Sequence, residues 1–304
     1  MKEHSKKTYT FENGYGHFGD NGWSYEISAP RTPRPWVNIV SNGVFGFILS
    51  QSGGGYSWRE NAQLNRINRW EQDLIKDEWG KFLYIRDCDS GTYWSAAWKP
   101  VCAEPDHYVC THGIGYSTIQ SRNNGIESEW TMFVPPNEPV ELWIVTVTNR
   151  SDRRRRLQLF TYFEWNLGAA PDWHREFHRS FIKTSFDPAA NALIATKRLW
   201  EVPSTKGHWN RNWEYVAFHG CSAQVLSYDA DKESFLGMYG NQRSPRAVSE
   251  GMPGAKTGDG LDPVASLQHD VVLGPGESKT LVYSIGAAGT LAEAKKIMAR
   301  FQGE

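Results

Sequence analysis

Short runs of alternating apolar residues, each bounded by turn residues, are the feature that most restricts how this chain can fold. Residues 126–134 place Ile126, Ser128, Trp130 and Met132 on one side of an extended segment. The same alternation places a second set on one face of residues 157–165: Leu157, Leu159, Thr161, Phe163 and Trp165. Turn sequences rich in Gly, Pro and Asn separate the runs, at 41–43, 52–55, 122–125, 134–139, 148–152 and 274–278. The pattern predicts an all-β fold, a large antiparallel structure of two packed sheets.

Three further runs fit the same fold. Residues 213–220 and 280–286 alternate, while residues 140–149 are almost continuously apolar, as in a strand buried on both faces. Residues 241–263 are rich in Gly, Pro and charge and predict a long loop. The basic run from Arg153 to Arg156 predicts a solvated hairpin turn, with a phosphate-binding patch as the alternative.

The end of the chain has helical spacing instead. Residues 290–302 place four apolar residues on one stripe: Leu291, Ala294, Met298 and Phe301. Thr290 and Glu293 fit a capping box, in which the hydroxyl and the carboxylate satisfy the first free backbone N–H groups. This amphipathic helix is expected either to begin a linker to a further segment or to fold back on the β-sandwich.

Charge and cysteine content narrow the class of protein. The chain has 33 Lys and Arg against 34 Asp and Glu, a net charge of -1, which argues against a nucleic-acid partner. No apolar run approaches the roughly 20 residues of a membrane helix, and the N-terminus has no apolar signal-peptide core. The four cysteines form no C-x-x-C pair, so free thiols in a reducing cytoplasm are expected.

Residues 167–181, "LGAAPDWHREFHRSF", concentrate acid, base and aromatic groups between two strand-like runs. His174 and His178 are four apart, but the zinc-protease pattern needs Glu beside the first histidine, and Glu176 lies two positions along. No metal site is therefore expected. Two interpretations of this segment remain. It is either a loop at a sugar site or an interface, or a purely structural, ion-paired loop.

Structural roles are predicted for the glycine-rich loop at 52–55 and for the proline-rich segment at 29–36. The loop lacks the G-x-x-x-x-G-K-[ST] pattern of a phosphate-binding loop, so a tight loop that packs against a neighbouring domain is favoured. The prolines predict a rigid extended segment. His17, His112 and His219 lie in or beside strand motifs and are expected to be hydrogen-bonded structural histidines.

A long block closely resembles the start of a known family. Residues 15–58, "YGHFGDNGWSYEISAPRTPRPWVNIVSNGVFGFILSQSGGGYSW", are similar to the glycoside hydrolase family 94 phosphorylases, formerly glycosyltransferase family 36. These include cellobiose, cellodextrin and chitobiose phosphorylases. The resemblance continues in order through "YIRD" (84–87), "HGIGYS" (112–117), residues 133–152 and residues 273–286.

The resemblance implies a domain plan. Residues 1–286 would form a galactose-mutarotase-like β-supersandwich, and residues 290–304 would begin a helical linker toward a catalytic (α/α)6 barrel. In the family the barrel supplies the catalytic aspartate and most of the phosphate site, so no catalytic residue is expected in this chain. A homodimer is also implied.

The implied reaction is inverting phosphorolysis of a β-glucoside to α-glucose 1-phosphate, a hexosyl transfer that uses inorganic phosphate as co-substrate and needs no cofactor. The expected substrate contacts are Asp172, Trp173, His174, Arg175 and His178 in the loop, and Tyr56, Trp58 and Arg59 beside the glycine-rich turn. The loop lacks the Asn/Asp/Gln-rich composition of cellobiose phosphorylases, which points to an acceptor other than plain glucose. A stand-alone carbohydrate-binding domain, or a scaffold domain without catalysis, is the alternative.

Overall fold

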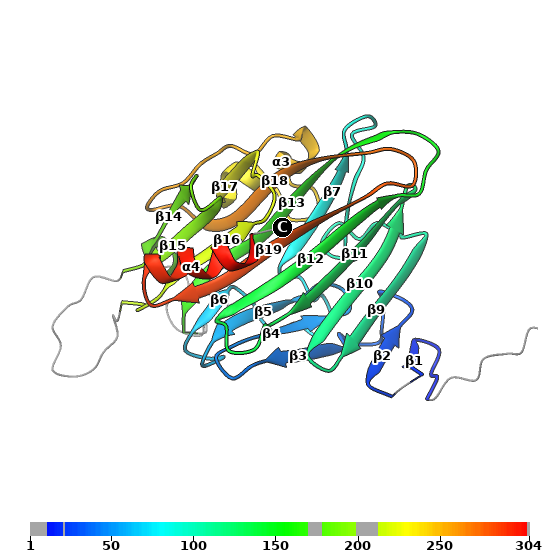
Figure 1. Ribbon diagram of the computed structural model, residues 1–304, viewed down its shortest axis with the longest axis horizontal. Coiled ribbons are helices and arrows are strands. Elements are labelled where there is room, and N and C mark those ends of the chain that lie inside the picture. The colour runs from blue at the N-terminus through cyan, green and yellow to red at the C-terminus, as the bar shows by residue number, and fades with distance from the viewer. Residues whose placement is uncertain (1–10, 21, 170–177, 199–211, 303–304) are drawn as a thin grey trace, which may run out of the picture.

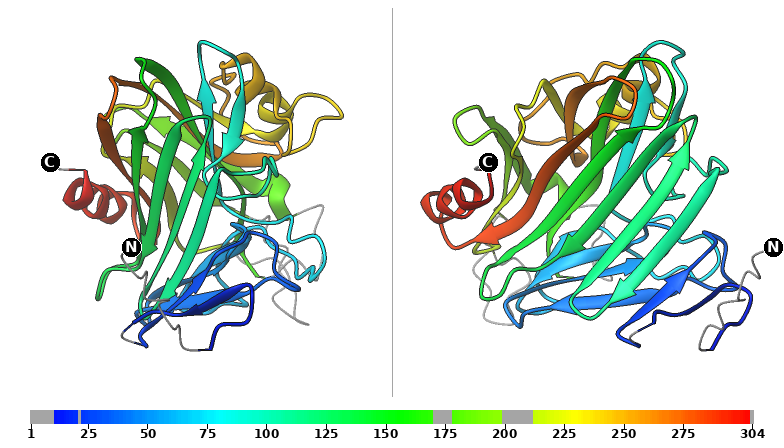
Figure 2. Two further views of the ribbon diagram at one scale, coloured as in Figure 1. Left: turned by 90° about the vertical axis from the view of Figure 1, so that its right-hand side faces the viewer. Right: turned by 45° about the vertical axis from the view of Figure 1, so that its right-hand side comes forward.

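The structure is a computed structural model that describes residues 11–20, 22–169, 178–198 and 212–302. Two antiparallel sheets pack face to face and enclose one large apolar core (Figure 1). The predicted all-β supersandwich is confirmed. Figure 2 shows the strands of the two sheets and, on the outer side of one of them, the C-terminal helix. Within the described residues, no helix has the length and apolar character needed to cross a bilayer.

The first sheet has ten strands, paired in an order that mixes the two ends of the chain. In that order they are β1 (Gly16–Phe18), β2 (Ser24–Ile27), β9 (His107–Gly113), β10 (Tyr116–Asn123), β11 (Ile126–Phe133), β12 (Val140–Asn149), β19 (Ser278–Ala288), β16 (Val216–Cys221), β15 (Ala192–Lys197) and β14 (Ile182–Asp187).

The second sheet has nine strands and is centred on the longest of them, β13 (Arg155–Gly168). Along the main path it runs β17 (Ser227–Asp231), β18 (Pro263–Leu273), β13, β6 (Arg66–Asn68), β5 (Gly55–Arg59), β4 (Phe45–Ser50) and β3 (Val37–Ser41). The first half of β13 also pairs with β7 (Phe82–Asp87), which pairs in turn with β8 (Tyr93–Ser95).

The alternation read from the sequence fixes which side chains enter the core. In β11 the four residues predicted on one side are all buried, and the five predicted on one face of β13 are buried as well. The opposite face of β13 is also covered, which the alternation did not predict. There, Phe160 and Tyr162 lie in a second apolar cluster, where the ring of Tyr162 stacks on that of Phe235 at 4.8 Å.

Two short helices provide that cover. They are α2 (Lys232–Leu236) and α3 (Arg246–Glu250), which lie on the outer face of the nine-stranded sheet (Figure 1). The predicted loop at 241–263 therefore contains a helix with buried residues rather than a uniformly exposed segment, because Ala247 and Val248 pack over β7 and β13.

The C-terminal helix α4 (Leu291–Phe301) folds back on the outer face of the ten-stranded sheet, against β16 and β19 (Figure 1). Its buried residues are Ala294, Ile297 and Met298, whereas Leu291 is 43% exposed, so the predicted stripe was wrong at its first position. Thr290 caps the helix as predicted, its hydroxyl accepting a hydrogen bond from the Glu293 N–H at 3.2 Å. Whether residues 290–304 also begin a linker stays a prediction.

The basic run beyond β12 is only partly the solvated turn that was predicted. Arg155 is buried and pairs with Asp87 at 2.9 Å, because the β7–β8 turn brings that carboxylate under β13. Arg153 and Arg156 remain exposed and pair with Asp89 at 3.1 and 2.8 Å. These pairings neutralise much of the local charge, which weakens the phosphate-patch alternative.

Candidate functional site

An aromatic cluster occupies the outer face of the nine-stranded sheet at β5 and β6. Successive strand residues point to opposite faces, and Ser57 points inward, where its hydroxyl donates to Glu141 of the other sheet. Its neighbours Tyr56 and Trp58 therefore point outward. The Tyr56 ring lies 5.5 Å from that of Trp58 and 5.1 Å from that of Trp70, with the guanidinium of Arg66 over the tyrosine at 4.3 Å.

The sheet brings this cluster to the base of the loop at 167–181. Arg66 of β6 is paired in register with Gly168, where β13 ends and the loop begins. Two segments singled out about 110 residues apart in the sequence therefore meet at one edge of the sheet. Of the expected contacts in the loop, Asp172, Trp173, His174 and Arg175 lie outside the described residues. His178 is described and is half-buried, directly before the short 3-10 helix η1 (Arg179–Phe181).

Arg59 does not join the aromatic cluster. Its guanidinium donates to the Ala287 carbonyl of the other sheet and lies 4.3 Å from the ring of Tyr215. Glu60 pairs with the same side chain at 3.2 Å. These contacts tie the two sheets together, so the structure separates Arg59 from the two aromatic residues with which it was predicted to bind substrate.

A buried carboxylate organises the base of the loop. Glu164, on the outer face of β13, is only 2% exposed and pairs with three cations: Arg179 at 3.1 Å, Arg69 at 3.2 Å and Lys232 at 2.7 Å. Burial alone would raise the pKa of Glu164, but Arg179, Lys232 and Arg69 together outweigh it and hold that pKa below the usual range. Glu164 is therefore an ionised anchor for the segments that carry these cations.

Both ends of the loop are fixed near this anchor. At the far end, Arg179 also donates to the carbonyls of Trp165, at 2.9 Å, and Pro263, at 2.8 Å. At the near end, the Asn166 amide donates to the Ala169 carbonyl at 2.9 Å. Lys197 donates to the Asn166 carbonyl at 3.2 Å, and its burial, with Arg179 nearby, lowers the pKa of Lys197 to about 8.

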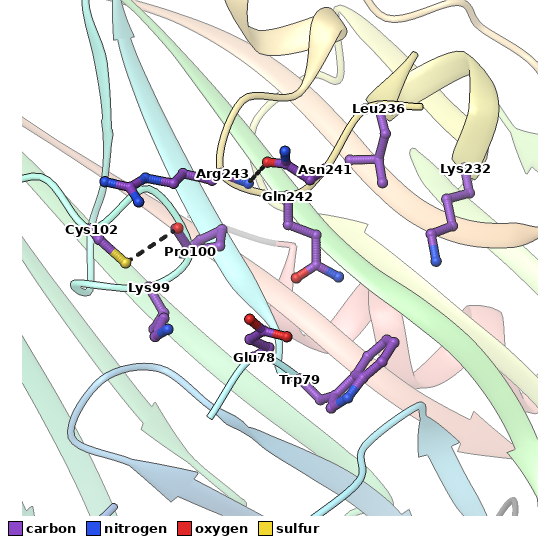
Figure 3. Close-up of a pocket in the computed structure, with 11 residues that line it drawn as sticks. Glu78, Trp79, Lys99, Pro100, Cys102, Lys232, Leu236, Asn241, Gln242 and Arg243 are labelled. Atoms are coloured by element: carbon purple, nitrogen blue, oxygen red, sulfur yellow. Dashed lines mark hydrogen bonds between the residues drawn. The ribbon is translucent and has the colours of Figure 1, made fainter. Parts of the chain in front are cut away.

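Beside this anchor lies a cavity of about 520 Å³, shown in Figure 3. Four segments line it: the residues before β7, the turn after β8, helix α2 and the link from α2 to α3. The lining comprises Glu78, Trp79, Lys99, Pro100, Cys102, Lys232, Leu236, Gly240, Asn241, Gln242 and Arg243. The sequence did not predict this site, because its four segments are spread between residues 78 and 243 and contain no motif.

Glu164 is also the residue that fixes one wall of the cavity. The Gln242 side-chain amide donates to Glu164 at 3.3 Å, and the Tyr84 hydroxyl donates to the backbone carbonyl of Gln242 at 2.8 Å. A single acidic residue among the aromatic and apolar residues of 157–165 was the signal in the sequence, since a buried charge in a strand needs partners.

The glycine-rich turn at 52–55 positions the opposite wall. The hydroxyls of Ser50 and Ser52 both donate to Asp77, at 2.6 and 2.5 Å. A side chain at Gly54 would come within 2.2 Å of the same carboxylate, so only glycine lets the two segments approach. The packing role predicted for these glycines thus has a partner in this chain, and it holds the segment that carries Trp79.

The comparisons with known proteins concern nearly the whole chain. A family model described as "Glycosyl hydrolase 94, supersandwich domain" matches residues 24–304. The chain is 30% identical over 276 residues to N,N'-diacetylchitobiose phosphorylase of Vibrio proteolyticus, covering 90% of this chain and 33% of that protein. It is 30% identical over 278 residues to solabiose phosphorylase of Paenibacillus borealis, covering 90% of this chain and 35% of that protein.

A bacterial glucoamylase structure, complexed with acarbose, superposes with a TM-score of 0.53 at 8% identity, covering 91% of this chain and 37% of that one. At that identity the likeness concerns the fold alone. The chain spans about a third of the length of the curated relatives it matches.

Proposed function

This chain belongs to the glycosyl hydrolase 94 family through its supersandwich domain, and on that premise we propose that it is the N-terminal domain of an inverting β-glucoside phosphorylase. The match over residues 24–304 carries the proposal, together with relatives that are themselves named disaccharide phosphorylases. In the complete enzyme the domain contributes an acceptor-side loop at 167–181 and contacts within a homodimer. The four unpaired cysteines fit a cytoplasmic location.

The chemistry of phosphorolysis is compatible with this division of labour. Phosphate is already an anionic nucleophile, so one carboxylic acid that protonates the leaving oxygen is enough, whereas an inverting hydrolase also needs a base for water. Glu164 is unsuited to that task, because three cations keep it ionised and a general acid must hold its proton. In keeping with the family resemblance, we propose that the catalytic acid lies outside these 304 residues, in the catalytic barrel.

What the described residues offer is positioning. Tyr56 and Trp58 present flat aromatic surfaces on the outer face of the sheet, and such surfaces pack against the C–H face of a sugar ring. The loop begins one strand away, at Gly168, and we propose that Trp173, His174 and Arg175 of the loop also contact the acceptor. Cationic side chains in the loop favour an acceptor that is longer or more acidic than glucose.

The first test uses the purified 304-residue chain with phosphate and a panel of β-linked glucose disaccharides. No glucose 1-phosphate is expected, and addition of the catalytic barrel restores its release. Phosphate-dependent release of glucose 1-phosphate by the 304-residue chain alone would overturn the assignment of the catalytic acid.

The second test measures the synthetic direction in the complete enzyme. Trp173→Ala and Tyr56→Ala are expected to raise KM for the acceptor about tenfold and leave KM for glucose 1-phosphate unchanged, the signature of lost acceptor binding. Trp23→Ala, directly before β2 of the ten-stranded sheet and 66% exposed, is the matched control. Unchanged acceptor KM in both variants would favour a scaffold role without a sugar contact.

A further inference from the structure

The cavity beside Glu164 combines an aromatic wall, neutral amides and excess positive charge, and we propose that it binds a sugar that carries an anionic group, either a carboxylate or a phosphate. The cavity consists only of described residues of this chain. The inference therefore goes beyond the proposed function, because it requires no phosphorolysis and is tested by binding alone.

The charge of the lining is the first observation. The lining contains three cations, Lys99, Lys232 and Arg243, and a single carboxylate, that of Glu78. Lys232 is already neutralised by Glu164 at 2.7 Å. For Lys99 and Arg243, the described part of the chain provides no carboxylate within 4 Å of the charged nitrogens. Lys99 and Arg243 therefore line the cavity without a direct ion pair to any described carboxylate, although Lys99 interacts at longer range with Asp73. Cations that are not engaged in an ion pair favour an anionic ligand, because charge-assisted hydrogen bonds are the strong ones.

The polar groups between the cations suit hydroxyls. Figure 3 shows the side chains of Gln242 and Glu78 pointing into the cavity from opposite sides. The Tyr84 hydroxyl fixes the Gln242 backbone, and the Gln242 side-chain amide is oriented by its hydrogen bond to Glu164. An amide and a carboxylate on opposite sides of a cavity can donate and accept the hydrogen bonds that ring hydroxyls require.

Aromatic surface completes the set. The Trp79 ring is half-buried, and the Arg69 guanidinium stacks on it at 3.9 Å, which fixes its orientation. The volume of about 520 Å³ lies within the ~300–1,000 Å³ range of small-molecule sites.

Calorimetric titration of the 304-residue chain tests the proposal with five probes at low salt: glucose 1-phosphate, gluconate, glucuronate, glucose and inorganic phosphate. At least one of the three anionic sugars is expected to bind about tenfold more tightly than both glucose and inorganic phosphate. The anionic sugar that binds most tightly shows whether the site prefers a phosphate or a carboxylate.

Variants locate the binding. Arg243→Gln and Lys99→Gln are each expected to weaken that probe about tenfold, since each removes one charge-assisted contact. Arg122→Gln and Lys279→Gln are matched controls, because both are exposed and lie on the other sheet, in β10 and β19. Circular dichroism of each variant confirms folding, so a loss of binding is not mistaken for unfolding.

A thiol readout makes the test independent of calorimetry. Cys102 lines the cavity and is half-buried, and Cys88 is the only other half-buried thiol in the described chain. The bound sugar is expected to slow alkylation of Cys102 severalfold and leave Cys88 unaffected. Equal affinity for inorganic phosphate and the anionic sugars would reduce the cavity to a simple anion site and overturn the proposal. The proposal would also be overturned if the anionic sugar bound Arg243→Gln as tightly as the unchanged chain, or if no anionic sugar saturated the chain in the millimolar range.

Discussion

Two buried histidines give this domain a specific sensitivity to acid. The Nδ1–H of His219 donates to the Ser284 carbonyl at 3.1 Å, and its Nε2 shares a hydrogen bond with the Thr161 hydroxyl at 2.8 Å. His269 contacts the Tyr283 hydroxyl at 3.1 Å. Burial lowers the pKa of His219 to about 3 and that of His269 to about 4. Both are therefore neutral in the fold and charged in the unfolded chain below pH 6.5.

The sign follows from proton uptake. Between pH 6.5 and about 4 the unfolded state binds more protons, so stability is complete above pH 6.5 and falls on acidification. Each histidine is expected to reduce the unfolding free energy by about 1.4 kcal/mol per pH unit. Urea unfolding at a series of pH values measures this slope. His269→Asn should reduce this slope by the equivalent of one proton taken up on unfolding. His107→Gln, at an exposed position on β9, should leave the slope unchanged. Equal slopes for the two variants would contradict the assignment.

At the scale of one element, α4 shows that two residues on the same predicted apolar stripe can differ in burial. Met298 is fully buried against β16 and β19, whereas Leu291 is 43% exposed although both have helical spacing. Met298→Ala is expected to cost about 2–4 kcal/mol of unfolding free energy, because a buried methionine leaves a cavity. Leu291→Ala should cost under about 1 kcal/mol, and denaturant unfolding compares the two. Similar costs for both would mean that α4 does not pack as described.

Some elements could be predicted from the sequence alone, and others could not. Strands such as β11 and β12 follow from alternation or from continuous apolar runs, since inner and outer faces are set by residues two apart. The cover of α2 and α3 over Tyr162 could not be predicted, because it depends on Phe235, 73 positions away. For the same reason, the lone acidic Glu164 in its apolar run could signal a buried charge, but its partners Arg69, Arg179 and Lys232, scattered along the chain, could not be identified from the sequence.

At the scale of the whole molecule, one buried ion pair joins the two sheets. Lys81, before β7, pairs with Glu141 of β12 at 2.5 Å, and the Trp143 indole donates to the same carboxylate at 2.7 Å. Both charged side chains are at most 1% exposed. Burial is the larger influence and lowers the pKa of Lys81, with Glu141 opposing it.

Removing one partner of this pair should be far worse than removing both. Lys81→Met is expected to cost about 3–5 kcal/mol, because it leaves Glu141 buried without a cation. The double variant Lys81→Met with Glu141→Gln should recover part of that loss, and a double-mutant cycle by denaturant unfolding measures the coupling. Additive costs would show that the two side chains do not depend on one another.

The anchoring of both loop ends has an evolutionary consequence. Because Glu164, Arg179 and Asn166 lie outside residues 170–177, their contacts do not depend on which side chains the intervening segment carries. Loop length itself contributes little, about 0.6 kcal/mol per doubling. Substitutions within the intervening segment would therefore leave these anchoring contacts in place, so its sequence can diverge between relatives while the sandwich beneath remains unaltered.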